Sequence, residues 1–331
     1  MKILITGVAG FIGYHLTKQL LNERYEIVGI DNINDYYSTD LKKDRLSLLE
    51  GQPNYKFINL DLKNREAIND LFVNERFDIV INLAAQAGVR YSIENPHAYL
   101  DSNIIGFTNI LESSAKNDIK HLIYASSSSV YGANKKIPFS EEDLVDSPVS
   151  LYAATKKANE LLAHSYSSIY KLPTTGLRFF TVYGPWGRPD MAYFSFVDNI
   201  VKDKKIKVFN NGDMYRDFTY IDDIVLGISK LVKKVGNKTI NQGEIPYDIF
   251  NIGNNNPEKL MDFINILEEL LQKKAKIEYL PMQKGDVKAT YASIDKLYNS
   301  VGFKPSTSLK DGLSNFVEWY LSYYGKNESD Y

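Results

Sequence analysis

The chain has 331 residues, of which 44% are hydrophobic and 24% are charged, as in an ordinary folded protein. Its formal net charge of −2 gives no overall field that would attract nucleic acid or an anionic membrane. Cysteine is absent, which excludes disulfides, thiolate zinc sites and a cysteine nucleophile. No run of 18 apolar residues occurs, and the N-terminal apolar run is broken by glycines without a cleavage site, so we expect a cytoplasmic protein that does not span a membrane.

Short apolar runs alternate with amphipathic stretches through the first half of the chain. The predicted strands are Lys2–Thr6, Glu26–Ile30, Lys56–Leu60, Ile79–Leu83, His121–Ala125 and Thr174–Phe180. The predicted helices lie near Phe11–Asn22, Arg65–Asn74, Ala98–Asn117 and Ser150–Tyr170. This alternation predicts parallel strands with right-handed crossovers, and hence a Rossmann-type, doubly wound α/β sheet. Ligands of such sheets bind at the carboxyl ends of the strands.

The sequence changes in character after Phe180. Residues 184–190 are too rich in glycine and proline to form a helix or strand, and they predict a domain junction. We expect a first domain over residues 1–180, with a return segment near 215–253, and a smaller α/β domain mainly over 181–325. Within the second domain, Asn256 and Pro257 predict the cap and first turn of a helix over Glu258–Leu271.

A glycine-rich segment with the pattern GxxGxxG follows the first predicted strand. Gly7, Gly10 and Gly13 would permit a tight turn and a close approach of a pyrophosphate to the start of the next helix. Asp31, at the end of the second strand, would accept hydrogen bonds from ribose hydroxyls and repel a 2′-phosphate, which favours NAD over NADP. The alternatives are a simple glycine-rich turn and a loop aspartate. The pair Asp61-Leu62, after the third strand, is placed to border the adenine.

A tyrosine and a lysine stand one helical turn apart at Tyr152 and Lys156. A nearby ammonium would stabilise a phenolate and lower its pKa, as a general base requires. The same spacing occurs from Tyr14 and from Tyr131, but only Tyr152 begins a long helix after a serine-rich strand end. The alternative interpretation is an exposed pair on the helix surface.

The serine-rich strand end contains Ser127, Ser128 and Ser129, whose hydroxyls could orient a substrate hydroxyl toward a base. On its own such a run is also typical of a polar turn. No metal is expected, because the four histidines have no i, i+4 pair, and we interpret them as surface or structural residues. These histidines are His15, His97, His121 and His164.

The order of these motifs resembles the extended short-chain dehydrogenase/reductase superfamily over roughly residues 1–320. Within it the chain is similar to nucleotide-sugar epimerases, and above all to UDP-glucuronate 4-epimerases. The segments that carry this resemblance are Asp31–Tyr37, Ala84–Arg90, Gly184–Ala192 and Arg216–Tyr220.

The resemblance implies an NAD cofactor, a UDP-sugar substrate and a role for each matching residue. Tyr152 would be the base, Lys156 would modulate its pKa and contact the ribose, and Ser127 would contact the sugar hydroxyl, a role that Ser128 or Ser129 could share. For the cofactor it also implies contacts from Gly7, Gly10, Phe11, Ile12, Gly13, Asp31, Asn32, Asp61, Leu62, Gln86 and Asn103. For the substrate it implies Arg90, Thr181, Arg188, Arg216 at the pyrophosphate and Asp286 at the uridine ribose. Galactose-type relatives carry arginine where this chain has Gln283, which would place more of the diphosphate binding on Arg216 and Arg188.

The resemblance implies C4 epimerisation of a UDP-sugar through a transient 4-keto intermediate, most closely UDP-glucuronate to UDP-galacturonate. UDP-glucose and UDP-N-acetylglucosamine are alternative substrates. A dehydratase or decarboxylase is disfavoured because no acidic residue follows Ser127 in the serine run. A non-catalytic NAD-sensing protein is the alternative from another class. Family members usually form homodimers through two long helices, here Ala98–Asn117 and Ser150–Tyr170.

Overall fold

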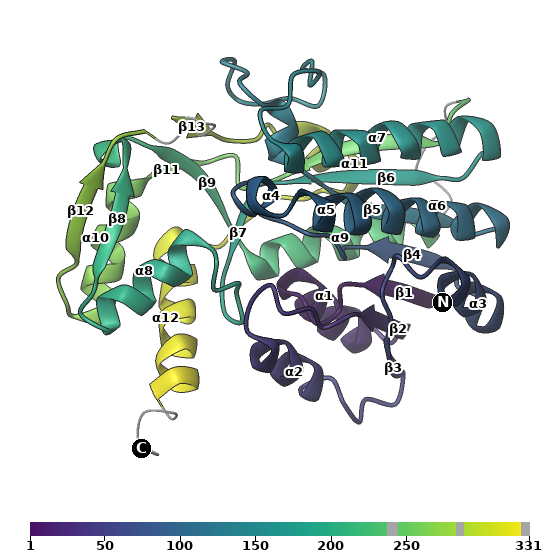
Figure 1. Ribbon diagram of the computed structural model, residues 1–331, viewed down its shortest axis with the longest axis horizontal. Coiled ribbons are helices and arrows are strands. Elements are labelled where there is room, and N and C mark those ends of the chain that lie inside the picture. Colours follow the sequence, from purple (N-terminus) through teal and green to yellow (C-terminus); the bar gives the residue numbers. More distant parts are fainter. Residues whose placement is uncertain (237–243, 283–287, 326–331) are drawn as a thin grey trace.

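The computed structural model describes residues 1–236, 244–282 and 288–325. Within them, seven parallel strands form one sheet in the order β10-β6-β5-β4-β1-β2-β3 (Figure 1). The strand order reverses between β1 and β4, which confirms the predicted Rossmann-type, doubly wound sheet. The strands are β1 (Lys2–Thr6), β2 (Glu26–Asp31), β3 (Tyr55–Asn59), β4 (Ile79–Asn82), β5 (His121–Ser127), β6 (Thr174–Phe179) and β10 (Tyr247–Ile252).

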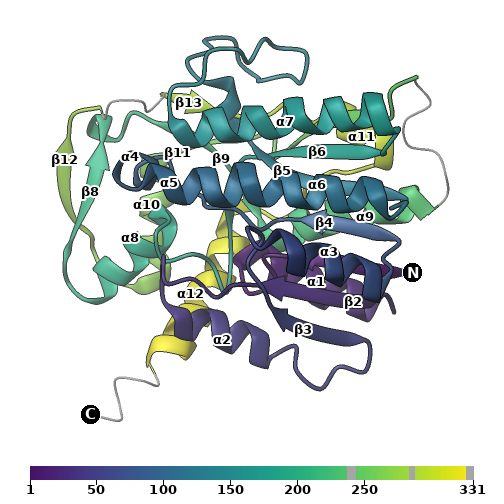
Figure 2. The same ribbon diagram turned by 45° about the vertical axis from the view of Figure 1, so that its right-hand side comes forward.

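Helices cover both faces of this sheet (Figure 2). Successive side chains of a strand point to opposite faces, so Leu4 packs toward one helical layer and Ile3 and Ile5 toward the other. Because both faces are covered, the strands are near-continuous apolar runs. One layer contains α3 (Arg65–Glu75), α6 (Phe107–Lys116) and α7 (Leu151–Tyr170), and the other contains α1 (Phe11–Asn22) and α9 (Ile221–Gly236).

The chain after β6 builds two smaller sheets beside the large one (Figure 1). β9 (Tyr215–Tyr220) pairs with β7 (Thr181–Tyr183), β11 (Pro257–Lys259) and β13 (Ala289–Thr290), and β8 (Lys205–Phe209) pairs with β12 (Lys276–Leu280). The accompanying helices are α8 (Ala192–Val201), α10 (Leu260–Leu271), α11 (Asp295–Val301) and α12 (Leu309–Gly325).

Two predicted helices differ from the structure. The prediction that Pro257 opens a helix is wrong, because Pro257–Lys259 pairs antiparallel with β9 and α10 begins only at Leu260. Pairing with a neighbouring strand therefore overrides the local cap-and-proline signal. The predicted helix Ala98–Asn117 is composite: α5 (Pro96–Tyr99) leads through a π-helical turn over Leu100–Gly106 into α6.

Several short elements were not predicted. The helix α2 (Thr39–Ser47) buries the charged residues Lys42 and Arg45 beside Leu41 and Leu46, so its sequence has no apolar periodicity to detect. The other short elements include α4 (Tyr91–Glu94) and the 3-10 turns over Ser128–Tyr131 and Asn210–Gly212. Apart from α10, the elements after residue 180 were not predicted either, among them the strand β10 of the large sheet. In the parts of the chain that the structure describes, no helix is both long and apolar enough to cross a membrane.

His121 is buried and His15 is partly buried, which makes folding stability sensitive to acid. Burial lowers the pKa of His121 to about 3 and, with the Pro185 carbonyl acting in the opposite direction, that of His15 to about 4. Unfolded histidine takes up a proton near pH 6.5, whereas these two stay neutral in the fold, so stability present above pH 6.5 is lost as the pH falls.

His121→Gln is expected to remove one of these contributions. Its side chain can still reach Thr175, which the His121 ring contacts at 2.8 Å between Nε2 and Oγ1, but it does not titrate. Between pH 6.5 and 5, the free energy of unfolding of the wild type, measured in urea, should fall by roughly 2 kcal/mol relative to that of this variant. The exposed His97, changed to Gln, is the matched control. The prediction would be contradicted if the difference in free energy of unfolding between the wild type and His121→Gln stayed constant with pH.

Candidate active site

A cavity of about 430 Å³ opens at the carboxyl ends of the central strands. Such a volume is typical of small-ligand sites. The glycine turn forms one wall: Gly7 has a φ of +75°, and a Cβ on Gly13 would lie 2.1 Å from the Gly7 carbonyl oxygen. Gly10 caps α1 without any side-chain hydrogen bond, so the first N–H groups of that helix face the cavity. This cradle fits the pyrophosphate of a dinucleotide.

The adenosine end of the cavity is acidic. Asp31 accepts hydrogen bonds from the backbone N–H groups of Ile33 at 2.8 Å and Ala9 at 3.1 Å, and burial raises its pKa. The Asn32 amide donates to Asp61 over 3.0 Å, which ties the ends of β2 and β3 together. The predicted cofactor residues that line the cavity are Gly7, Gly10, Phe11, Ile12, Gly13, Asp31, Asn32, Asp61, Leu62 and Gln86.

Tyr152, Lys156 and Ser127 line the same cavity, as does the serine run. Lys156 is buried and its ammonium donates to the Ala125 carbonyl at 2.9 Å, and burial lowers its pKa to about 8. Burial also raises the pKa of Tyr152, while contact with Ser127 and the charge of Arg188 act in the opposite direction. The prediction of a lowered tyrosine pKa is therefore wrong for this structure, because desolvation exceeds the effect of the neighbouring groups.

The other two tyrosines of the same spacing have different roles. Tyr14 is buried in the core between α1 and α2. The hydroxyl of Tyr131 donates to Asn251 and accepts from Arg178, and its partner in the spacing, Lys135, is exposed. The structure thus brings only the pair at Tyr152 and Lys156 to the cavity, as the sequence predicted.

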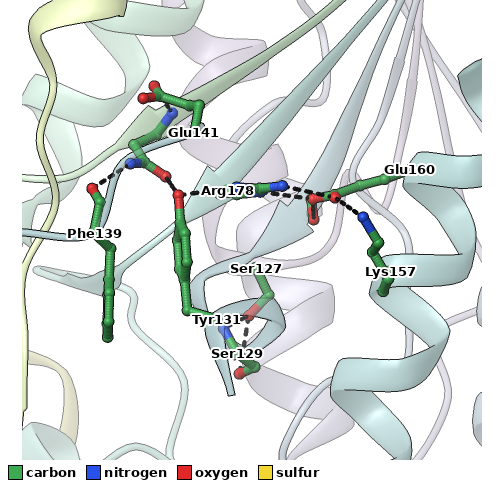
Figure 3. Close-up of polar contacts among 10 residues, drawn as sticks. Ser127, Ser129, Tyr131, Phe139, Glu141, Lys157, Glu160 and Arg178 are labelled. Atoms are coloured by element: carbon green, nitrogen blue, oxygen red, sulfur yellow. Dashed lines mark hydrogen bonds and ion pairs between the residues drawn. The ribbon is translucent and has the colours of Figure 1, made fainter. Parts of the chain in front are cut away.

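A buried ion pair lies behind the serine run. The carboxylate of Glu160 accepts from Arg178 at 2.8 and 2.9 Å and from the Ser126 hydroxyl at 2.7 Å. Figure 3 shows Arg178 between Glu160 and Tyr131, with Ser127 and Ser129 below them. Glu160 lies one turn beyond Lys156 and two beyond Tyr152 on α7, so a single helix face carries all three. Glu160 thereby joins the ends of β5 and β6, through Ser126 and Arg178, to the helix that carries the tyrosine.

Thr181 and Arg188 line another part of the cavity. Thr181 begins β7, and Arg188 lies in the loop that joins β7 to α8. Arg188 forms an ion pair with Asp190, in which Nη2 lies 2.6 Å from Oδ2. Both residues therefore line the same cavity as Tyr152.

Three of the predicted residues that the structure describes do not line the cavity. Asn103 lies behind it, where its side chain donates to the Gln86 carbonyl at 3.0 Å and accepts from the Gln86 N–H at 2.8 Å. Arg90 lies over the Phe209 ring at 5.3 Å, and Arg216 donates to the backbone carbonyls of its own strand and of residue 288. Asp286, like Gln283, lies outside the described residues.

Sequence reasoning missed several side chains at this site, among them Tyr36, Lys42 and Arg45. Tyr36 and Lys42 line the cavity, and the fully buried Arg45 lies directly behind it. The Arg45 guanidinium donates to the carbonyls of Ala9 at 2.8 Å, Trp186 at 2.7 Å and Gly187 at 3.0 Å. It thereby joins the glycine turn to the loop that carries Arg188. Tyr36 belongs to a segment already noted for its resemblance, but nothing in the sequence signals that Arg45 is buried.

The dinucleotide turn and the tyrosine–lysine pair face each other across one cavity of a doubly wound sheet, which defines an NAD-dependent enzyme of the extended short-chain dehydrogenase/reductase class. The chain belongs to the NAD dependent epimerase/dehydratase family, whose profile matches residues 3–253. It is 56% identical to Protein CapI of Staphylococcus aureus, over 98% of this chain and 100% of that one. It is 46% identical to a probable UDP-glucuronate 4-epimerase of Rhizobium meliloti, over 98% of each chain. The fold is similar to the crystal structure of UDP-glucuronic acid 4-epimerase from Bacillus cereus in complex with UDP-glucuronic acid and NAD, with a TM-score of 0.90, 35% identity and coverage of 98% of this chain and 100% of that one.

Proposed function

We propose that this chain catalyses the NAD-dependent C4 epimerisation of UDP-glucuronate to UDP-galacturonate. The observation that carries the proposal is that Tyr152, Lys156 and Ser127 line the same cavity as the dinucleotide turn. Arg188 beside them offers a guanidinium, which suits the C6 carboxylate that distinguishes a uronate from a neutral hexose. The relatives that are named for this activity match the whole length of the chain to within a few residues.

The residues of the site divide the chemistry between them. Tyr152 takes the proton of the C4 hydroxyl, and Ser127 orients that hydroxyl by a hydrogen bond. Bound NAD would supply the acceptor of the C4 hydride and its donor to the opposite face of the sugar, so no net oxidation would result. Burial lowers the pKa of Lys156 to about 8, and we assign its ammonium to the ribose of the cofactor. Ser127 and Arg188 oppose the effect of burial on the pKa of Tyr152.

The C6 group needs particular control. The 4-keto form of a glucuronate is a β-keto acid, which loses carbon dioxide when the C5–C6 bond overlaps the ketone. We assign Thr181 and Arg188 to holding the carboxylate out of that orientation, since both line the cavity on the side of β7. Arg216 and Asp286 are proposed for the UDP end, and Arg90 for the substrate, on the family resemblance.

Incubation of the purified protein with UDP-glucuronate tests the proposal. We expect UDP-galacturonate to appear until the two sugars reach equilibrium, with no UDP-xylose, when the nucleotide sugars are separated by anion-exchange chromatography. UDP-glucose and UDP-N-acetylglucosamine, supplied in parallel, test the alternative substrates. Turnover of either one with none of UDP-glucuronate would overturn the assignment, and no turnover of any UDP-sugar would favour an NAD-sensing protein.

We also infer a homodimer built on α5, α6 and α7. Large apolar side chains are exposed along this layer, and Leu161 on α7 and Ile105 in the π-helical turn are 60% and 48% exposed.

The proposed domain division is the one given by the sequence, residues 1–180 with a return near 215–253 and a second domain mainly over 181–325. It is supported by β10, which pairs with β6 in the large sheet. The cytoplasmic location stays a prediction.

A further inference from the structure

The Arg188 guanidinium is held along one edge only. Its Nε donates to Asp190 Oδ1 at 3.0 Å and its Nη2 to Asp190 Oδ2 at 2.6 Å, a bidentate ion pair. Among the residues that the structure describes, none accepts a hydrogen bond from Nη1 of Arg188. A guanidinium has five N–H groups, so the end formed by Nη1 and the second Nη2 hydrogen remains able to bind another carboxylate.

Tyr36, in the loop after β2, contacts this ion pair. Its hydroxyl donates to Asp190 Oδ2 at 3.2 Å, and its ring centroid lies 5.9 Å from the central carbon of the Arg188 guanidinium. The Tyr36 ring itself packs against Tyr91, with centroids 4.7 Å apart. The aspartate and the tyrosine therefore come from segments more than 150 residues apart and meet on one arginine.

The base of the Arg188 side chain is fixed as well. Its backbone N–H donates to the hydroxyl of Tyr193 at 3.2 Å, and Tyr193 is buried in the core. Arg188 remains 22% exposed and lines the cavity together with Thr181 and Tyr152. Its charge also acts to lower the Tyr152 pKa, as expected of a cation close to the reacting hydroxyl.

We propose that Asp190 and Tyr36 are positioning residues that set the specificity of the enzyme for a uronate, by holding Arg188 with its free end toward the C6 carboxylate. This inference rests on the proposed function. An arginine side chain that is ordered before binding loses little rotamer freedom when the carboxylate arrives, so affinity for the charged sugar rises. Asp190 binds the edge of the guanidinium formed by Nε and Nη2, so it does not compete with the substrate carboxylate for the end that includes Nη1.

Asp190→Asn tests the inference, because it removes the charge and keeps the size of the side chain. We expect the KM for UDP-glucuronate, and its dissociation constant by calorimetry, to rise about tenfold. The KM should rise more than kcat falls, whereas affinity for UDP and for UDP-glucose should stay within about twofold, because neither carries a C6 carboxylate. Tyr36→Phe removes only the hydroxyl and should weaken UDP-glucuronate binding in the same direction by a smaller factor.

The exposed Asp146, changed to Asn, is the matched control and should leave all constants unchanged. Equal losses of affinity for UDP, UDP-glucose and UDP-glucuronate in Asp190→Asn would indicate a general structural role and overturn the inference. Tighter binding of UDP-glucuronate would overturn it too, because Asp190 would then be a competitor. If the wild type turns over UDP-glucuronate and Asp190→Asn has the same KM and dissociation constant for it, only this inference fails. If the wild type neither binds nor turns over UDP-glucuronate, the proposed function fails with it.

Discussion

Tyr152→Phe is expected to slow the conversion of UDP-glucuronate to UDP-galacturonate by roughly 10²–10⁴-fold, the range typical of losing a general base. The ring stays in place against Tyr99, whose centroid lies 6.0 Å away, so the cavity keeps its shape. Only the oxygen that receives the C4 proton is lost. Chromatography of the nucleotide sugars gives the rate, and calorimetry should show that affinity for UDP-glucuronate is nearly unchanged.

Tyr170→Phe provides the control for this substitution. Tyr170 ends the same helix and is 59% exposed, far along α7 from the cavity. The Tyr170→Phe variant should retain full activity. If Tyr152→Phe kept more than a tenth of the wild-type rate, another group would have to be the base, and the assignment of this site would be wrong.

Glu160→Gln is expected to lower the free energy of unfolding by about 3–5 kcal/mol, because it leaves a buried guanidinium without a counter-charge. Glu160 and Arg178 are 2% and 3% exposed, and the charge-assisted hydrogen bonds between them are 2.8 and 2.9 Å long. Urea denaturation followed by circular dichroism measures the loss. Activity should fall as well, since the carboxylate also holds the Ser126 hydroxyl beside Ser127.

Two further variants separate the buried pair from ordinary charge effects. Lys157→Met removes a cation 3.8 Å from the same carboxylate, partly in solvent, and should cost less than about 1 kcal/mol. Arg178→Met combined with Glu160→Gln removes both charges and should recover much of the lost stability. A loss below 1 kcal/mol in Glu160→Gln alone would show that the pair does not stabilise the strand end.

Six of the seven strands of the large sheet could be predicted from the sequence, because they are largely apolar runs bounded by turn residues, whereas β10 was not predicted as a strand. That signal does not depend on distant neighbours, so β1, β5 and β6 were found to within two residues. The helix expected at Pro257 failed for the opposite reason. A three-residue strand forms there only because β9 passes beside it, and β9 lies some 40 positions earlier in the chain.

The cofactor half of the cavity could also be predicted, because the glycine turn and Asp31 follow consecutive strands of one unit. The sugar half depends on contacts across the fold. Arg188 could be assigned to the substrate only through the family resemblance. Tyr36, which donates to the ion-pair partner Asp190, comes from the loop after β2. The direction of the Tyr152 pKa shift depends on burial, which no spacing along the helix reveals.

Arg45 gives the two halves of the cavity a shared dependence. Its guanidinium is the hydrogen-bond donor for carbonyl oxygens in both the nucleotide turn and the loop that carries Arg188. Loss of this side chain would leave those oxygens buried without donors, at about 1–3 kcal/mol each. The two loops therefore cannot diverge independently during evolution. A change in backbone path that altered the preference for a sugar would also have to preserve the binding of the dinucleotide.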